Sequence, residues 1–284
     1  MTKFDGKKIR DEILADLKKK IAASPTEPIL AVIWVGDDPI SEKYIRSKQK
    51  AADYIGVDFQ LIKLSDSVRH YDIIAKLIML SELEFGGIMI QMPLPAKINR
   101  QRIIAAIPRK KDVDGLRFCA GLSSDFQPPV VLAILEAIKE SKIDIQKSRL
   151  AIIGQGFLVG APLKKILKSE VKELLVADIT TDDLPEITKN ADVIISAAGQ
   201  PGLITAEMVK NGVVLIDAGT SEVGGKIVGD IEPAAYQKSS FYTPVPGGIG
   251  PLTVAMLYKN LVATATKLND EIRIKNDEKI KKSE

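Results

Sequence analysis

Two side chains on one predicted helix could carry out proton-transfer chemistry. Tyr44 and Lys48 lie four residues apart in a segment of helical periodicity, so they share a face of that helix. The rest of that face is apolar, with Ile40, Ala51 and Ile55, which places the Lys48 ammonium where a core residue is expected. Such a lysine either packs its stem and extends its ammonium to solvent, or holds the ammonium partly buried, where desolvation lowers its pKa.

Gln91 and Asp114 could act together with that lysine. Gln91 ends a short apolar segment that is predicted to be a strand, and Asp114 lies in the polar sequence Lys-Asp-Val-Asp-Gly. Ligands of a parallel sheet bind outside the carboxyl ends of its strands, and there Gln91 would meet the helix that follows the first strand. The alternative is that Gln91 caps its strand and Asp114 is an ordinary turn carboxylate.

A glycine-rich turn indicates a nucleotide site in the second half of the chain. An apolar strand-like segment at 150–153 precedes it, and a helical segment follows. Backbone N–H groups at such a turn can approach a pyrophosphate, and the helix dipole favours the negative charge. The spacing is one residue longer than the common dinucleotide fingerprint, so a tight turn without a ligand is the alternative. The candidate cofactor-binding residues of the turn are Gly154, Gln155, Gly156, Val159 and Gly160.

Asp178 bears on which nicotinamide cofactor binds. It follows the next predicted strand, where the dinucleotide motif places an acidic residue against the adenosine ribose. A carboxylate there accepts hydrogen bonds from ribose hydroxyls and repels a 2′-phosphate, and no Lys or Arg lies between Val176 and Asp183. We therefore expect an NAD(P) site that favours NAD over NADP. Thr220, after a later predicted strand, is a further candidate contact to the cofactor.

A segment rich in proline and glycine precedes the last predicted helix. Its sequence over 243–251 is Thr-Pro-Val-Pro-Gly-Gly-Ile-Gly-Pro. Because proline fixes the backbone and glycine carries no side chain, a flat ligand could lie against Pro246, Gly247 and Gly248. A turn into the helix with no further role is the alternative.

The elements that would position these groups alternate along the chain between apolar segments and helical periodicity. This alternation is typical of an α/β fold with parallel strands and helices on both faces. The expected strands are at 29–35, 58–64, 87–91, 150–153, 174–177, 193–197 and 213–216. We expect two doubly wound domains: residues 1–121, completed by a last helix within 251–284, and a Rossmann-type nucleotide domain of residues 122–250.

The composition is that of an ordinary globular enzyme and excludes several classes of function. Hydrophobic residues make up 45% and charged residues 27%, and the net charge of +3 gives no reason to propose nucleic acid or a membrane as partner. The single Cys119 excludes an intrachain disulfide, and the single His70 excludes a multi-histidine metal site. No segment reaches the ~18 apolar residues of a membrane span. We expect a cytoplasmic protein without a metal.

Five segments, in order along the chain, resemble motifs of the bifunctional methylenetetrahydrofolate dehydrogenase/methenyltetrahydrofolate cyclohydrolase family. These segments are 41–48, 90–95, 111–115, 159–162 and 244–251. The resemblance implies oxidation of 5,10-methylenetetrahydrofolate to 5,10-methenyltetrahydrofolate with NAD(P)⁺, hydrolysis of that product to 10-formyltetrahydrofolate, and a homodimer. It also implies that the N-terminal domain and the last helix bind folate.

The resemblance assigns roles to particular residues. It places the catalytic lysine on Lys48, with Tyr44 orienting it and Gln91 tuning its charge state. It gives Asp114 the role of holding the pterin ring. The residues that it places at the substrate are Tyr44, Lys48, Gln91, Met92, Asp114, Pro246, Gly247 and Gly248.

The chain departs from the family pattern at the nucleotide site. Gly156 stands where the family commonly has serine, and Asp178 begins a segment in which the family often has basic or hydroxyl side chains. Both changes affect the choice of cofactor. Three alternatives remain: a cyclohydrolase with a weakened dehydrogenase, another two-domain dehydrogenase such as one for a shikimate-like acid, and a non-enzymatic nucleotide sensor.

Overall fold

The computed structural model describes residues 1–82 and 86–264 of the chain. The chain divides into two compact units, each built on a parallel sheet. The glycine-turn unit comprises residues 1–11 and 128–256, and the lysine unit comprises residues 12–127 and the described residues from 257 onward. The expected α/β class with two parallel-sheet domains is confirmed.

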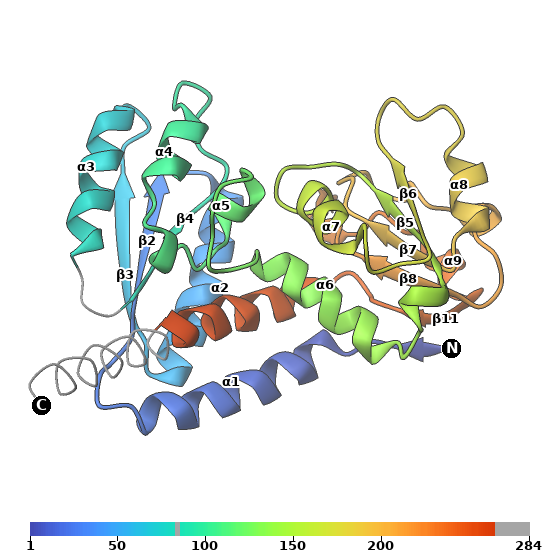
Figure 1. Ribbon diagram of the computed structural model, residues 1–284, viewed down its shortest axis with the longest axis horizontal. Coiled ribbons are helices and arrows are strands. Elements are labelled where there is room, and N and C mark those ends of the chain that lie inside the picture. The colour runs from blue at the N-terminus through green and yellow to red at the C-terminus, as the bar shows by residue number, and fades with distance from the viewer. Residues whose placement is uncertain (83–85, 265–284) are drawn as a thin grey trace, which may run out of the picture. The chain divides into compact units, whose positions relative to one another are not determined.

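The lysine unit contains a three-stranded parallel sheet in the order β3-β2-β4. Residues 30–33 of the central strand are completely buried, which agrees with a continuous apolar run in a strand covered on both faces. Helices pack around the strands (Figure 1). The strands are β2 (Ile29–Val35), β3 (Asp58–Leu64) and β4 (Gly87–Ile90); the helices are α2 (Pro39–Ile55), α3 (His70–Ser81), α4 (Arg100–Ala106) and α5 (Leu116–Cys119), with a 3₁₀ turn η1 (Arg109–Lys111).

Both ends of helix α2 are capped by residues of the types that commonly end helices. The Asp38 carboxylate accepts a hydrogen bond from the Ser41 N–H at 2.7 Å, and Pro39 occupies the first turn. At the other end Gly56 adopts φ 81° and donates its N–H to the Ala52 carbonyl. These two caps fix the register of α2, and so the height at which Lys48 stands beside the sheet.

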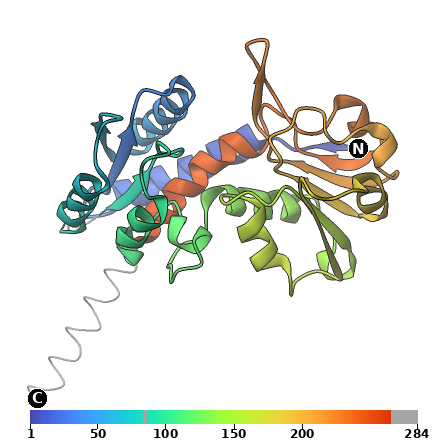
Figure 2. The same cartoon turned by 90° about the horizontal axis from the view of Figure 1, so that it is seen from above.

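The glycine-turn unit contains a six-stranded parallel sheet in the order β1-β11-β8-β7-β5-β6. Its strands are β1 (Thr2–Lys3), β5 (Arg149–Ile153), β6 (Glu173–Ala177), β7 (Val193–Ser196), β8 (Val213–Asp217) and β11 (Ser239–Tyr242). Its helical segments are α6 (Pro129–Glu140), η2 (Ile145–Lys147), α7 (Gly160–Leu167), α8 (Leu184–Asn190), η3 (Ala206–Met208) and α9 (Pro233–Tyr236). Strands β9 (Ser221–Val223) and β10 (Lys226–Val228) form an antiparallel hairpin that projects beyond this sheet (Figure 2).

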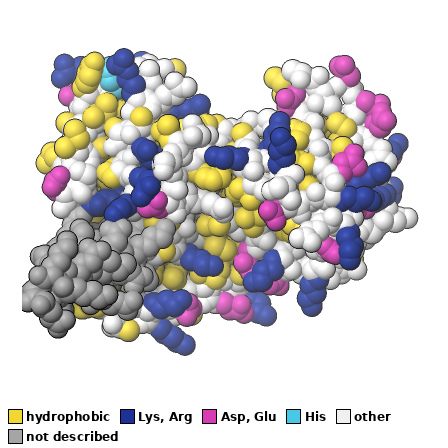
Figure 3. Space-filling view, in the orientation of Figure 1, with side chains coloured by type: hydrophobic (Ala, Val, Ile, Leu, Met, Phe, Trp, Pro, Cys, Tyr) yellow, Lys and Arg dark blue, Asp and Glu magenta, His cyan; other side chains and the backbone are white. Residues whose placement is uncertain are grey.

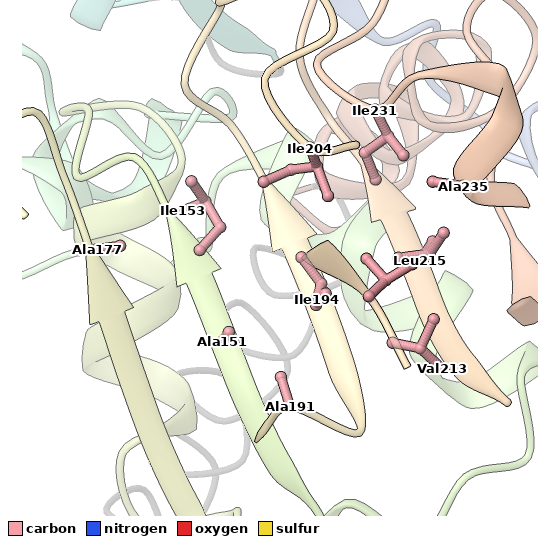
Figure 4. Packing of buried hydrophobic residues seen from close by; sticks show 11 residues of the cluster. Ala151, Ile153, Ala177, Ala191, Ile194, Ile204, Val213, Leu215, Ile231 and Ala235 are labelled. Carbon is pink, nitrogen blue, oxygen red and sulfur yellow. The ribbon is translucent and has the colours of Figure 1, made fainter. Parts of the chain in front are cut away.

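Small and branched apolar side chains pack together on one face of this sheet. Ile153 on β5, Ile194 on β7 and Leu215 on β8 point to the same side and are at most 2% exposed (Figure 4). The alternation of inward residues along each strand, such as Ala151 and Ile153, is the period of two that a strand imposes.

The division of the chain differs from the expected boundaries of 1–121 and 122–250. Strand β1 pairs with β11 in the glycine-turn unit, with Thr2 opposite Phe241, and α1 (Gly6–Ala22) begins in that unit. A strand of two residues leaves no periodic signal, and for this reason β1 was not expected. The lysine unit takes the chain up to Gln127, and a helix covers residues 249–264. The remainder of the expected last helix, 265–284, lies outside the described residues.

The charge distribution on the surface and the length of the helices bear on nucleic acid and membranes as partners. Lys and Arg side chains lie interspersed with Asp and Glu on the face drawn in Figure 3, without a continuous basic stripe. Within residues 1–82 and 86–264, no helix is both long and apolar enough to span a bilayer.

Candidate active site

The structure brings Lys48 and Gln91 together at the carboxyl edge of the three-stranded sheet. Lys48 Nζ donates a hydrogen bond to Gln91 Oε1 at 2.9 Å. Gln91 directly follows β4 and is 6% exposed, and its Nε2 donates to the Met92 carbonyl at 2.7 Å. Because the amide nitrogen is bound to the backbone, the amide oxygen is the atom that faces the ammonium. Lys48 and Gln91 therefore meet at the carboxyl ends of the strands, as expected for a parallel sheet.

Lys48 and Asp114 shift each other's pKa through their opposite charges. Burial lowers the pKa of the Lys48 ammonium, and the Asp114 charge raises it in part. Burial raises the pKa of Asp114, and the Lys48 charge lowers it in part. Burial therefore favours the neutral form of each group, while their mutual attraction favours the charged pair. A lysine balanced in this way can release and take up a proton more readily than one in water.

The two aspartates of the Asp-Val-Asp-Gly sequence have different surroundings. The Asp112 carboxylate is fully buried and accepts the N–H groups of Leu116 at 3.1 Å and Arg117 at 2.7 Å, so it caps the short α5. Burial raises the pKa of Asp112 to about 6. Asp114 is the one whose charge acts on the lysine. Sequence reasoning missed Asp112, although an aspartate just ahead of a helical segment is a signal for a cap.

The expected apolar face of α2 is wrong at its N-terminal end. Ile40 and Tyr44 are 50% and 42% exposed, and the buried side of the helix there is formed by Ser41 and Ile45. The core therefore contacts this end of α2 through Ser41 and Ile45, and the side that carries Ile40 and Tyr44 is turned away from it. Tyr44 is exposed and stands one turn before the half-buried Lys48 on the same face of the helix.

Two residues on the last helix, which sequence reasoning missed, hold both parts of this site. The Tyr258 hydroxyl donates to the Lys48 backbone carbonyl at 2.6 Å, and Tyr258 is completely buried. Asn260 Nδ2 donates to the carbonyls of Val113 and Gln127, each at 2.9 Å. The helix therefore anchors the backbone of the lysine and of the segment that carries Asp114. The available signal was Tyr258 and Asn260, two side chains with polar groups beside the apolar residues Leu257 and Leu261.

The glycine turn after β5 requires glycine at two of its three positions. Gly154 adopts φ 94°, and a Cβ on it would lie 2.6 Å from the Ala197 carbonyl oxygen. A Cβ on Gly160 would lie 1.8 Å from the Gly154 oxygen, so the first turn of α7 packs directly on the loop. Gly156 faces open space with nothing within 4 Å of a built Cβ. A close backbone turn with open space above it, at the start of a helix, fits a dinucleotide pyrophosphate.

The other predicted cofactor residues lie along the same sheet edge. Gln155 is half-buried in the turn and donates to the Gly154 carbonyl at 3.1 Å, and Val159 stands directly before α7. Thr220 is exposed after β8. The order of the strands reverses between β5 and β7, and this is the switch point at which such sheets bind nucleotides.

Asp178 is exposed after β6 and is held in an ionised form by its own loop. One carboxylate oxygen accepts the Thr180 N–H at 2.9 Å and the Thr180 hydroxyl at 2.6 Å. These bonds, with a smaller contribution from the charge of Lys164, lower the pKa of Asp178. Lys164 comes from α7, fourteen positions before Asp178, and therefore lies outside the segment between Val176 and Asp183.

The Pro246–Gly248 loop belongs to the glycine-turn unit, whereas Lys48 belongs to the lysine unit. Gly248 donates its N–H to the Pro244 carbonyl at 2.8 Å. A Cβ on Gly6, at the start of α1, would lie 1.9 Å from the Gly248 carbonyl oxygen. The loop is thus held by direct backbone packing against the beginning of α1.

Comparison with known proteins decides the family. Residues 4–114 match the catalytic domain of tetrahydrofolate dehydrogenase/cyclohydrolase, and residues 128–269 match its NAD(P)-binding domain. The chain belongs to this family. The family resemblance expected from the five motifs is confirmed, and the finding favours the folate interpretation over other two-domain dehydrogenases.

Curated relatives and solved structures agree over nearly the whole length. The bifunctional protein FolD of Nautilia profundicola is 36% identical over 285 residues, which cover 96% of this chain and 100% of the relative. The structure of a bifunctional FolD from Campylobacter jejuni superimposes with a TM-score of 0.89 at 37% identity, covering 94% and 99% of the two chains. The Trypanosoma brucei FolD, solved with NADP and an inhibitor, gives 0.86 at 30% identity, covering 95% and 98%.

Proposed function

We propose that this chain oxidises 5,10-methylenetetrahydrofolate to 5,10-methenyltetrahydrofolate with NAD(P)⁺ and hydrolyses the product to 10-formyltetrahydrofolate. The family assignment gives the reaction class. The observation that supports Lys48 as the group that moves protons is its hydrogen bond of 2.9 Å to Gln91 in a site where burial lowers the lysine pKa.

Each residue of the lysine site has a role in hydrolysis. Water attacks the electrophilic methenyl carbon, and Lys48 takes up the proton that the water loses and returns one as the ring opens. Gln91 stabilises the ammonium form through its oxygen, so that burial does not fix the amine as neutral. Burial raises the pKa of Asp114 and the Lys48 charge offsets this in part, so that in its charged form Asp114 can accept N–H groups of the pterin ring.

The glycine turn supports the oxidation step by binding the cofactor. A nicotinamide nucleotide, when bound, accepts the hydride of the methylene bridge. The contribution of the chain is to hold the pyrophosphate with backbone N–H groups at the start of α7 and to orient the ring. Gly154, Gln155, Gly156, Val159, Gly160, Asp178 and Thr220 are proposed as its contacts, and Met92, Pro246, Gly247 and Gly248 as further contacts of the folate.

Replacement of the lysine tests the hydrolytic assignment. Lys48→Met should lower the hydrolysis rate by about 10²–10⁴-fold, the usual contribution of a positioned acid or base. Nucleotide affinity, measured by fluorescence titration, should stay unchanged. Lys50→Met, at an exposed position of the same helix, is the matched control. Hydrolysis of methenyltetrahydrofolate by Lys48→Met at the wild-type rate would exclude the assignment.

We propose that NAD is preferred over NADP. The ionised Asp178 repels a 2′-phosphate, and its hydrogen bonds with Thr180 hold it at the end of β6. Steady-state kinetics with each nucleotide should give a higher kcat/KM for NAD, and Asp178→Ser should reduce the difference. A strong NADP preference of the wild type would refute this proposal. The homodimer and the cytoplasmic location stay predictions; light scattering of the purified chain tests the first.

A further inference from the structure

Two carboxylates outside the predicted site are buried at the carboxyl edge of the six-stranded sheet. Asp217 is the last residue of β8, and Asp230 lies between β10 and α9. Both are completely buried. Buried acids are costly unless their oxygens are bound, so each must contribute something to the structure around it.

Asp230 binds the end of β7 and the loop after it through one oxygen. Its Oδ2 accepts the Ser196 hydroxyl at 2.8 Å, the Ala198 N–H at 2.7 Å and the Gly199 N–H at 3.2 Å. Ser221 on β9 binds the same loop, because its hydroxyl donates to the Gly199 carbonyl at 3.0 Å. The backbone at 197–199 is thereby fixed in one conformation.

Asp217 holds Asp230 in turn. Its Oδ1 accepts the N–H of Asp230 at 3.2 Å and that of Gly219 at 2.9 Å, and its Oδ2 accepts the Ile231 N–H at 2.9 Å. Two glycines make room for the pair. A Cβ on Gly219 would lie 2.1 Å from Asp230 Oδ1, and a Cβ on Gly229 would lie 2.1 Å from Asp217 Oδ2.

The loop that Asp230 fixes forms one wall of the strand-order switch point. The Gly154 position, on the opposite side, is in contact with it: a Cβ there would be 2.6 Å from the Ala197 oxygen and 2.9 Å from the Ala198 Cα. A shift of 197–199 would therefore displace the first glycine of the nucleotide turn. Loops at this switch point are where a dinucleotide lies in such sheets.

One carboxylate oxygen of the pair, Asp230 Oδ1, is buried without a hydrogen-bond partner within the described part of the chain. Burial, with the nearby charge of Asp230, raises the pKa of Asp217 to about 7. The neutral form of Asp217 removes one of two like charges in a dry environment, and Asp230 Oδ2 keeps its three hydrogen bonds.

We propose that Asp230, held by Asp217, is a positioning residue for the nicotinamide nucleotide. It acts through the backbone of 197–199, which it fixes against Gly154 at the switch point, and not through contact with the folate. This inference rests on the proposed function, since it names what organises the nucleotide site of that enzyme.

Two variants of Asp230 test the proposal. Asp230→Asn keeps the shape but loses the charge-assisted bonds, and Asp230→Ala removes the acceptor. Each should weaken nucleotide binding by about tenfold or more in a direct titration, since charge-assisted hydrogen bonds are roughly twice as strong as neutral ones. The KM for the nucleotide should rise in parallel, while the KM for folate and the nucleotide-independent hydrolysis stay within about twofold of wild type.

Asp192→Asn is the matched control. Asp192 accepts the Arg149 N–H at 2.7 Å and an ammonium hydrogen of Lys210, and so joins β5 and β7 at the opposite, amino edge of the same sheet. Its loss should lower stability without changing nucleotide affinity. Wild-type affinity in Asp230→Asn, or equal losses of hydrolysis and binding, would overturn the proposal. If Asp230→Ala does not fold, the nucleotide affinity of Asp230→Asn decides the test. Because nucleotide affinity is measured without folate, its result does not depend on whether the proposed folate chemistry is correct.

Discussion

Replacing Tyr258 with phenylalanine tests whether the last helix sets the position of Lys48. The change removes a hydroxyl that donates over 2.6 Å to the Lys48 carbonyl and leaves the buried ring in place. That carbonyl also accepts the ordinary helical bond from four residues ahead, so no buried acceptor is left without a partner. The expected cost is therefore the net value of one neutral hydrogen bond, about 1 kcal/mol. For a chain of this size, this lowers Tm by roughly 2–4 °C.

The effect on hydrolysis should exceed the effect on stability. A displacement of ~1 Å at a catalytic group can reduce a rate by up to ~10²-fold, so we expect about a tenfold loss of methenyltetrahydrofolate hydrolysis in Tyr258→Phe. Nucleotide affinity should not change. Tyr54→Phe, an exposed tyrosine on α2, is the control for the loss of a hydroxyl. A lower Tm with a wild-type hydrolysis rate would refute the positioning role, and an unchanged Tm would refute the hydrogen bond itself.

Two further predictions concern the nucleotide turn and the dependence of stability on pH. Gly156→Ser adds a hydroxyl in open space beside the nucleotide turn. One added hydrogen bond to a charged group should tighten nucleotide binding by up to about tenfold, as measured by fluorescence titration. Equal affinity of the variant and the wild type would mean that the hydroxyl does not reach the phosphate. Burial raises the pKa of Asp112 to about 6 and that of Asp217 to about 7. The folded protein therefore binds protons at these groups more tightly than the unfolded chain does. This contribution to the free energy of unfolding is fully present below pH ~4 and is lost as pH rises through 6 and 7. For Asp217, a pKa that moves from 3.8 to about 7 corresponds to roughly 4 kcal/mol, which urea denaturation from pH 4 to 8 would detect; a free energy of unfolding that rises steadily over this interval contradicts the assignment.

Local signals predicted the parts of the fold that local chemistry decides. Asp38, Pro39 and Gly56 determine the ends of α2 through bonds to residues at most four positions away. The buried strand β2 is a continuous apolar run, and the requirement for glycine at 154 and 160 follows from the close turn between strand and helix. The sheet-edge argument then placed Gln91 near Lys48 because parallel strands end at a common edge.

The remaining features depend on partners that are far apart in the sequence. Tyr258 meets Lys48, Asn260 meets Val113 and Asp230 meets Ser196 only after the chain has folded, and none of these pairs lies within one periodic segment. The outward position of Tyr44 on α2 has the same origin. Helical periodicity gives the residues that share a face, but the neighbouring core decides which side of the helix is buried, and at this end of α2 that side carries Ser41 and Ile45.

The pairing of Thr2 with Phe241 limits how this chain can be divided into working pieces. The glycine-turn unit is made from two separate stretches, and the backbone passes between the two units at three places. A fragment that begins at Pro128 would contain the nucleotide turn but lack β1, leaving β11 as an unprotected sheet edge with open backbone N–H and C=O groups. Such an edge invites pairing with other chains, so a soluble nucleotide-binding fragment would need residues 1–5 supplied again, by fusion to its end or as a separate peptide.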